Sequence, residues 1–199
     1  MSKTIEYFLS PQSPWCYLGH QRLVDLARET GAQVEPKPFD LGKVFSVSGG
    51  LPLAKRAPQR QVYRLVELER WARFLGLPMN AQPQFFPVSP DAASTLIIAA
   101  RTSLGADAAL DLSGAIMRAL WAEEKNIADE DTLAQIANLC GFDGRMLLKS
   151  AQTPGVQEQY ERNTEEAIAA NVFGVPWYVV DGEGFWGQDR LDFVRRALE

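Results

Sequence analysis

The pattern of hydrophobic and polar positions predicts a β-α-β unit in the first forty residues. Thr4–Leu9 is short, apolar and rich in strand-forming residues. From Pro14 the apolar positions recur at helical spacing, which predicts an amphipathic helix that stops at Gly31. Gln33–Phe39 alternates between apolar and polar residues, but its two prolines restrict it to an edge strand or a strand end.

Helical periodicity dominates the middle of the chain. Two segments rich in glycine or proline, Asp40–Pro58 and Pro78–Pro90, are predicted to be irregular, and such loops often carry substrate contacts. Asp91, Asp129 and Asp143 are suitable N-caps. The segments predicted to be helical are Gln59–Leu75, Asp91–Leu104, Ala106–Glu123, Glu130–Cys140 and Asp143–Gln152.

The last part of the chain predicts an α-β-β-α unit. Thr153–Gly155 interrupts the helical pattern, which resumes over Gln157–Asn171. Val175–Val180 is an apolar strand, and a hairpin turn at Asp181–Gly184 leads to a second strand that begins at Phe185–Gly187. An amphipathic helix over Gln188–Leu198 follows.

Composition narrows the classes of function. The 199 residues include 20 Lys and Arg against 25 Asp and Glu, and the net charge of −5 argues against nucleic acid or an anionic membrane as a partner. No apolar stretch reaches the ~18 residues of a membrane span, and no signal peptide is evident, so we expect a soluble cytoplasmic protein. The single histidine, His20, argues against a histidine-based metal site or a Ser-His-Asp triad, so we expect no metal.

The turn Ser13-Pro14-Trp15-Cys16 between the first strand and the first helix has two interpretations. Serine is a favoured N-cap and proline is common at the first helical position, so the pair could simply begin a helix. The same helix end carries a partial positive charge and unpaired N–H groups, which favour the thiolate form of a thiol held against it. Ser13 could donate a hydrogen bond to such a thiolate.

These features together resemble a known family. A strand, an x-Pro-x-Cys turn, a helix and a later Val-Pro strand, with helices inserted between the halves, resemble the DsbA-like branch of the thioredoxin fold. Ser13 replaces the first cysteine of its redox motif, as in kappa-class glutathione transferases and, more closely, the 2-hydroxychromene-2-carboxylate isomerases. The resemblance rests on SPWCYLGHQRL (13–23), YRLVELERWARFLGLP (63–78), VFGVPW (172–177) and WGQDRL (186–191).

The resemblance implies an α/β protein with a thioredoxin-like fold and a large all-helical insertion. It places the two halves of the thioredoxin-like domain at residues 1–54 and 155–199 and the insertion at 55–154. It also implies a glutathione-dependent isomerase that acts on 2-hydroxychromene-2-carboxylate or a related aromatic keto acid. Glutathione thiolate would add reversibly to the substrate, a bond would rotate, and elimination would return glutathione. Family members are commonly dimers, so we expect a homodimer.

The resemblance also assigns residues, which share one site in the family. Ser13 matches the serine that binds the glutathione sulfur and is the implied catalytic residue. Val175, at the position before the family's cis-proline, would pair with the cysteinyl unit. The implied γ-glutamyl contacts are Trp186, Gly187, Gln188 and Asp189, with Asp189 on the α-ammonium. Arg60 falls near a contact of the glycyl carboxylate, and the positions near the aromatic substrate are Lys55, Phe45 and Phe85, of which the two phenylalanines replace a lysine and a tyrosine.

Two alternatives remain open from the sequence. In the first, the protein is a kappa-like glutathione transferase or a thiol–disulfide oxidoreductase in which Cys16 is chemically active. We favour an inert, buried Cys16 at the second position of a lost redox pair. In the second, the protein is a non-catalytic thioredoxin-like binding protein, and Ser13-Pro14 only caps a helix.

Overall fold

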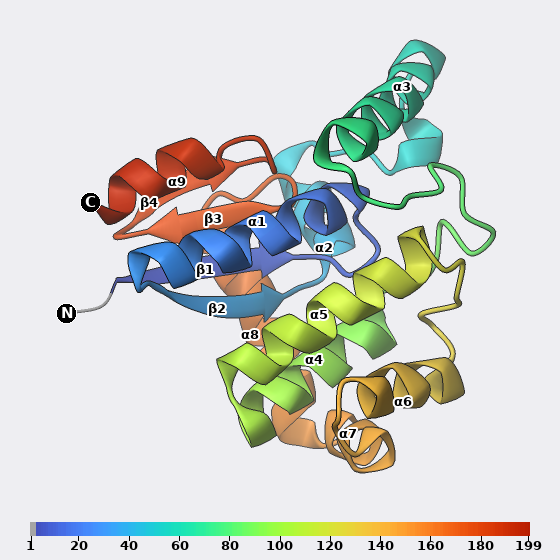
Figure 1. The fold of residues 1–199 in the computed structure, drawn as a ribbon, viewed down its shortest axis with the longest axis vertical. Helices are drawn as coiled ribbons and strands as arrows, with labels where there is room; N and C mark the ends of the chain where they lie inside the picture. Colours follow the sequence, from blue (N-terminus) through green and yellow to red (C-terminus); the bar gives the residue numbers. More distant parts are fainter. Residues whose placement is uncertain (1–2) are drawn as a thin grey trace.

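The computed structural model describes residues 3–199 and contains a four-stranded sheet in the order β2-β1-β3-β4 (Figure 1). The strands are β1 (Thr4–Leu9), β2 (Gln33–Pro38), β3 (Trp177–Val180) and β4 (Glu183–Trp186). β1 pairs with β2 in parallel and with β3 in antiparallel orientation, so that Ile5 lies opposite both Val34 and Val180. The first and last parts of the described chain therefore meet in the centre of the sheet.

Helices cover both faces of this sheet. α1 (Pro14–Thr30) and α9 (Leu191–Leu198) lie side by side on one face, and α8 (Pro154–Ala169) packs on the other face against β2 (Figure 1). The positive φ of 69° at Gly31 ends α1 in the conformation that favours glycine. This arrangement is the thioredoxin-like α/β fold that the family resemblance implies.

The remaining helices form a group beside the sheet and a projection from it. α4 (Asp91–Leu104), α5 (Ala106–Trp121), α6 (Glu130–Leu139) and α7 (Gly144–Ala151) pack on one another, and α4 and α5 also contact β2. α3 (Pro58–Leu75) projects away from the sheet (Figure 1), and its only fully buried side chains are Leu68 and Ala72. None of the helices in residues 3–199 is long and apolar enough to span a membrane.

The prediction of an irregular segment over Asp40–Pro58 is wrong in part. Leu41–Ser48 forms the helix α2, and Leu53–Lys55 forms a short 3₁₀ turn, η1. Asp40 caps α2, because its carboxylate accepts a 3.0 Å hydrogen bond from the Lys43 N–H. Leu41, Val44 and Phe45 have helical spacing, but α2 is only eight residues long and lies in a segment rich in glycine and proline, so the sequence pattern indicates a loop.

Three smaller predictions are corrected at element ends. Asp129 and Asp143 cap their helices as predicted, but the cap of α4 is Pro90, and Asp91 lies in the first turn instead. α8 begins at Pro154, earlier than predicted, because proline suits the first helical position. β4 begins at Glu183, since the hairpin turn needs only two residues.

The sequence pattern also predicts Trp71, Phe74 and Trp121 to be core residues. Trp121 is fully buried, and Trp71 is half-buried against Leu68 and Ala72. Phe74 is 77% exposed, so the prediction is wrong for this residue. Helical spacing identifies a face, but only the tertiary neighbours decide whether that face is covered.

Candidate functional site

Ser13 begins α1 with its side chain directed at the helix end. Its backbone is extended (φ −78°, ψ 124°), and Oγ accepts a 3.3 Å hydrogen bond from the Cys16 N–H. The Ser13 N–H donates to the Ser10 carbonyl at 2.9 Å, which fixes the turn before the helix. The hydroxyl proton takes no part in the cap, so it can be donated to an anion at the positive end of the helix.

Cys16 is held as a neutral thiol. The side chain is fully buried, and burial raises its pKa to about 11, although hydrogen bonds from Ser10, Ser13 and Tyr7 act in the opposite direction. The thiolate is the nucleophilic form of cysteine, and at neutral pH almost none of it is present at this position. The reactive sulfur at this helix end would therefore have to come from a bound molecule.

A cavity of about 270 Å³ lies beside the start of α1. The predicted γ-glutamyl contacts line it together with Val175, although they come from different parts of the chain. Four residues that the sequence did not assign to the site complete its wall: Trp15, Glu67, Trp71 and Arg190. The full set of lining residues is Trp15, Glu67, Trp71, Val175, Trp186, Gly187, Gln188, Asp189 and Arg190.

Val175 presents open backbone at the edge of this cavity. The Val175-Pro176 peptide bond is cis, and the Pro176 carbonyl accepts a 3.0 Å hydrogen bond from the Gly187 N–H. This bond ties the strand β3 to the turn after β4. In residues 3–199 the N–H and the carbonyl of Val175 have no hydrogen-bond partner, so both are available to an extended peptide.

The turn after β4 is built around a glycine. Gly187 has φ +112°, and a Cβ there would lie only 2.6 Å from Oδ1 of Asp189. The Asp189 carboxylate also accepts a 2.8 Å bond from Arg190. Gln188 is held by α1, because Arg22 of that helix donates to the Gln188 carbonyl at 2.6 Å and also to its side-chain oxygen. The turn thus supplies a carboxylate and a guanidinium side by side.

Ser13, which the resemblance makes the catalytic residue, is buried at the start of α1 and is not among the residues that line this cavity. Four other predicted residues also lie outside it. Lys55 and Arg60 are exposed in η1 and in the first turns of α3. Phe45 is half-buried and packs over Gly50, and Phe85 is half-buried against the core. None of these four residues lines the cavity next to Val175. The structure therefore brings Val175 together with the predicted γ-glutamyl contacts, but not with the predicted glycyl and substrate contacts.

Glu67 and Trp71 are the lining residues that the sequence could have revealed. They are four residues apart, so they lie on one face of α3, and both fall within the segment 63–78 that carries the family resemblance. Glu67 also pairs with Arg70 on the same helix. Trp71 is predicted to be a core residue, and a charged residue such as Glu67 is by default part of a solvated helix face, so neither was assigned to the site.

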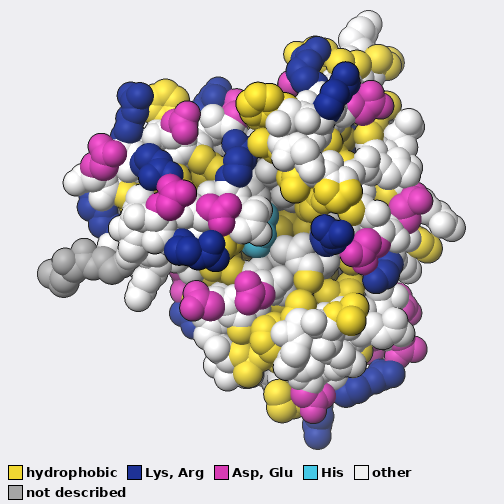
Figure 2. Space-filling view, in the orientation of Figure 1, with side chains coloured by type: hydrophobic (Ala, Val, Ile, Leu, Met, Phe, Trp, Pro, Cys, Tyr) yellow, Lys and Arg dark blue, Asp and Glu magenta, His cyan; other side chains and the backbone are white. Residues whose placement is uncertain are grey.

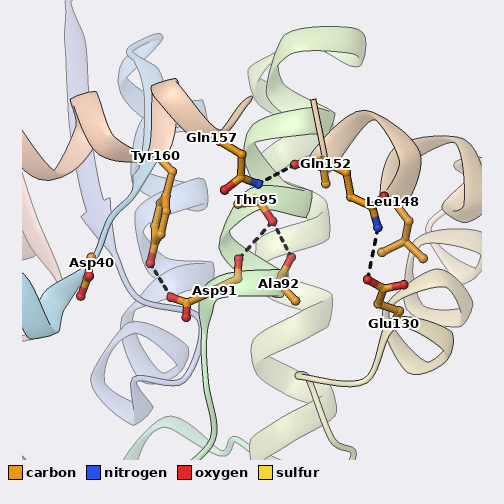
Figure 3. Close-up of a pocket in the computed structure, with 10 residues that line it drawn as sticks. Asp40, Asp91, Ala92, Thr95, Glu130, Leu148, Gln152, Gln157 and Tyr160 are labelled. Carbon is orange, nitrogen blue, oxygen red and sulfur yellow. Dashed lines mark hydrogen bonds between the residues drawn. The ribbon is translucent and has the colours of Figure 1, made fainter. Parts of the chain in front are cut away.

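A second cavity, of about 430 Å³, shares no residue with the first (Figure 3). It lies where α4, α7 and α8 meet, and protein groups satisfy its polar atoms. Tyr160 donates to Asp91 at 3.0 Å, and Gln157 donates to the Ala151 carbonyl at 2.9 Å. These hydrogen bonds join α4 and α7 to α8, so they indicate a structural role for this cavity.

Comparisons with known proteins agree with the fold. A family model described as a DSBA-like thioredoxin domain matches residues 4–199. A 2-hydroxychromene-2-carboxylate isomerase from Sphingobium xenophagum is 32% identical over 200 residues, which cover 100% of this chain and 99% of that protein. Glutathione S-transferase kappa 1 from Homo sapiens is 23% identical over 208 residues, which cover 100% of this chain and 92% of the relative. A solved structure of a 2-hydroxychromene-2-carboxylate isomerase superposes with a TM-score of 0.82 at 26% identity, covering 98% of this chain and 94% of that chain.

Proposed function

Because the chain belongs to the family of DsbA-like thioredoxin domains, we propose that it is a glutathione-dependent isomerase of 2-hydroxychromene-2-carboxylate or a related aromatic keto acid. One observation carries the proposal: the helix end where a redox cysteine would stand holds Ser13, and the remaining cysteine is a buried, neutral thiol. Relatives named as such isomerases, which align over the whole chain, support the same reaction.

The residues around the 270 Å³ cavity fit glutathione. Its γ-glutamyl end carries an ammonium and a carboxylate, and the cavity offers the Asp189 carboxylate beside the Arg190 guanidinium. The open N–H and carbonyl of Val175 suit the cysteinyl peptide unit. Gly187 supports this fit, since the space that a Cβ would fill there is taken by Asp189.

The main contribution of the protein is electrostatic. Bound glutathione would supply a thiolate that adds reversibly to the conjugated keto acid and leaves after a bond has rotated. The partial positive charge at the start of α1 lowers the pKa of a thiol held there, and the Ser13 hydroxyl donates to the thiolate. Such a preorganised donor is typically worth 10²–10³ in rate, because it needs no reorganisation during the reaction.

A kappa-like glutathione transferase is the second candidate. It is favoured by the full-length similarity to glutathione S-transferase kappa 1, and it would use the same glutathione site. The thiol–disulfide oxidoreductase is disfavoured, because burial raises the pKa of Cys16 to about 11. We expect iodoacetamide to leave Cys16 unlabelled in the folded protein and to label it in urea, as read by peptide mass spectrometry; rapid labelling of the native thiol would restore this alternative.

We also propose a homodimer that works in the reducing cytoplasm. α3 supports the dimer, since its outer face carries exposed apolar side chains at Val62, Tyr63 and Val66. Hydrophobic side chains gather over α3 and its junction with the start of α1 (Figure 2). Contiguous apolar surface of this kind is typical of interfaces between proteins. The two free cysteines, Cys16 and Cys140, suit a reducing compartment.

The decisive experiment combines binding and turnover. We expect calorimetric heat on titration with glutathione and a glutathione-dependent change in the absorbance of 2-hydroxychromene-2-carboxylate. Binding without isomerisation, together with conjugation of an electrophilic acceptor, would favour the transferase. The absence of both heat and turnover would leave a thioredoxin-like binding protein in which Ser13 is only a cap.

A further inference from the structure

Arg64 of α3 stands against two aromatic rings with an unsatisfied hydrogen-bond donor. Its Cζ atom lies 4.9 Å from the ring centroid of Phe86 and 5.8 Å from that of Trp121. Within residues 3–199, Nη2 of Arg64 is buried and has no partner, and the same holds for Nε1 of Trp121. Both atoms can only donate hydrogen bonds. What this cluster lacks is therefore an acceptor.

No protein carboxylate neutralises this arginine. In the described part of the chain Arg64 forms no ion pair, whereas Arg70 on the same helix pairs with Glu67. Arg56 and Arg60 precede Arg64 at four-residue intervals, and they also form no ion pair among the described residues. Burial, and secondarily the charge of Arg56, lower the pKa of Arg64 to about 10, so the guanidinium is still charged at neutral pH.

A partly buried charge without a counter-ion is unfavourable, and an anionic ligand removes the penalty. The planar fork of a guanidinium matches the two oxygens of a carboxylate, and the aromatic rings already fix its orientation. The acceptor that best suits this cluster is therefore a carboxylate.

The cluster lies next to the candidate site and away from its γ-glutamyl end. Leu68, one turn after Arg64, packs with Leu18 of α1 and with Trp15, which lines the 270 Å³ cavity. Glu67 and Trp71 of α3 line the same cavity, so the helix runs from that cavity back toward Arg64. Phe86 directly follows Phe85, one of the predicted substrate contacts.

We infer that Arg64, oriented by Phe86 and Trp121, binds the carboxylate of an aromatic acid substrate and so selects acidic over neutral substrates. This inference rests on the proposed function and names the group that recognises the substrate. Arg56 adds positive charge to the same subsite. The glycyl carboxylate of glutathione has the same chemistry, and the experiment separates the two.

The first test compares Arg64→Gln with Arg73→Gln, which removes an exposed arginine of the same helix. With saturating glutathione, we expect Arg64→Gln to raise KM for 2-hydroxychromene-2-carboxylate about 10- to 100-fold with a smaller change in kcat, because a charged hydrogen-bond pair is lost. Arg73→Gln should behave as the wild type, and the Kd of glutathione should be unchanged in both. An unchanged KM, or a loss of glutathione affinity alone, would overturn the inference.

The second test needs no turnover. We expect the wild type to bind salicylate at least about 10-fold more tightly than salicylamide in a fluorescence titration, and Arg64→Gln to lose this preference. Arg64→Lys keeps the positive charge but lacks the planar guanidinium, so it should show only part of the wild-type preference for salicylate. Equal affinity of wild type and Arg64→Gln for salicylate would refute the carboxylate subsite.

These readouts separate the inference from the proposed function. A salicylate preference that depends on Arg64, in a protein that does not isomerise, leaves the subsite standing and removes the isomerase. Normal isomerisation by Arg64→Gln removes the subsite and leaves the isomerase standing. Circular dichroism checks that the variants fold, and Phe86→Leu, which keeps the arginine but removes one ring, should weaken salicylate binding less than Arg64→Gln does.

Discussion

At the scale of single residues, the site separates two roles that one cysteine pair has in a redox enzyme. Ser13 keeps the place at the helix end but has no sulfur, and Cys16 keeps its sulfur but is buried away from the cavity. Burial raises the pKa of the Cys16 thiol, whereas the helix end lowers that of any thiol bound beside Ser13. Under the proposed function, the protein therefore activates a foreign thiol and keeps its own thiol inert.

Removal of the Ser13 hydroxyl tests this division. We expect Ser13→Ala to lower kcat about 10²- to 10³-fold through the lost donor, and to lower the free energy of unfolding by about 1 kcal/mol through the lost cap. Asp129→Ala is the matched control, because it removes the cap of α6 far from the cavity and should affect stability alone. Steady-state kinetics and urea unfolding check both; wild-type turnover in Ser13→Ala would exclude the mechanism.

The sequence identifies Ser13 as the cap of α1 because capping is local chemistry, whereas the role of the turn at 186–189 is implied only by the family resemblance. It misses Arg64, since an arginine on an amphipathic helix is solvated by default, and its lack of a carboxylate partner depends on residues distant in sequence. For the same reason Phe74 is mistaken for a core residue. Local chemistry can be derived from one sequence, whereas the partners of a long side chain cannot.

At the scale of elements, the turn between β4 and α9 determines the shape of the proposed γ-glutamyl end of the glutathione site. We expect Gly187→Ala to weaken glutathione binding about 10-fold or more, because φ +112° strains an L-residue and the new Cβ displaces Asp189. Gly182→Ala has a comparable positive φ of 85° but no atom within 4 Å of the new Cβ. It should reduce stability to a similar degree and leave the calorimetric Kd unchanged. Equal loss of affinity in both variants would assign the effect to the backbone alone.

The contact between α1 and α5 makes the stability pH-dependent. Nε2 of His20 donates to the Leu110 carbonyl at 3.0 Å, and a Cβ at Gly114 would touch the ring, so the two helices approach closely. Burial lowers the pKa of His20 to about 4, below its unfolded value of 6.5. The neutral ring therefore stabilises the fold fully above about pH 6.5, and this contribution is lost as the pH falls toward 4.

The expected loss over that window is roughly 3 kcal/mol in the free energy of unfolding. His20→Gln lacks a titrating ring, so its stability should fall less between pH 7 and pH 4 than that of the wild type, even if it is lower at pH 7. Urea unfolding at several pH values measures the difference. Parallel curves for the two proteins would contradict the burial of a neutral histidine.

At the scale of the whole molecule, the exposed face of α3 predicts assembly. We expect light scattering to show a dimer for the wild type and a monomer for the double variant Val62→Asp, Val66→Asp, because two charges would be buried in the interface. Leu139→Asp, which changes an exposed apolar residue of α6, should remain a dimer. A monomeric wild type would show that there is no dimer interface. A double variant that stays dimeric would place the interface elsewhere.

The architecture was largely accessible from the sequence, because strands and long amphipathic helices have strong periodicity. α2 was missed since its eight residues hold only about two turns of apolar spacing, and the glycines and prolines around it indicate a loop. The union of Val175 and Asp189 in one cavity followed from the resemblance and not from the pattern. Only folding brings these distant segments together, so neither the composition nor the spacing of residues indicates that they share a cavity.

The central pairing of β1 with β3 has a consequence for biosynthesis. Ser13 emerges early from the ribosome, but Val175 and Asp189 follow only after the whole helical region. A nascent chain that ends before Val175 exposes the helix end without the edge that we propose binds the cysteinyl unit of glutathione. Glutathione should therefore not bind to incomplete chains on the ribosome. Its binding would report that the segment around Ser13 and the segment from Val175 to Asp189 have come together.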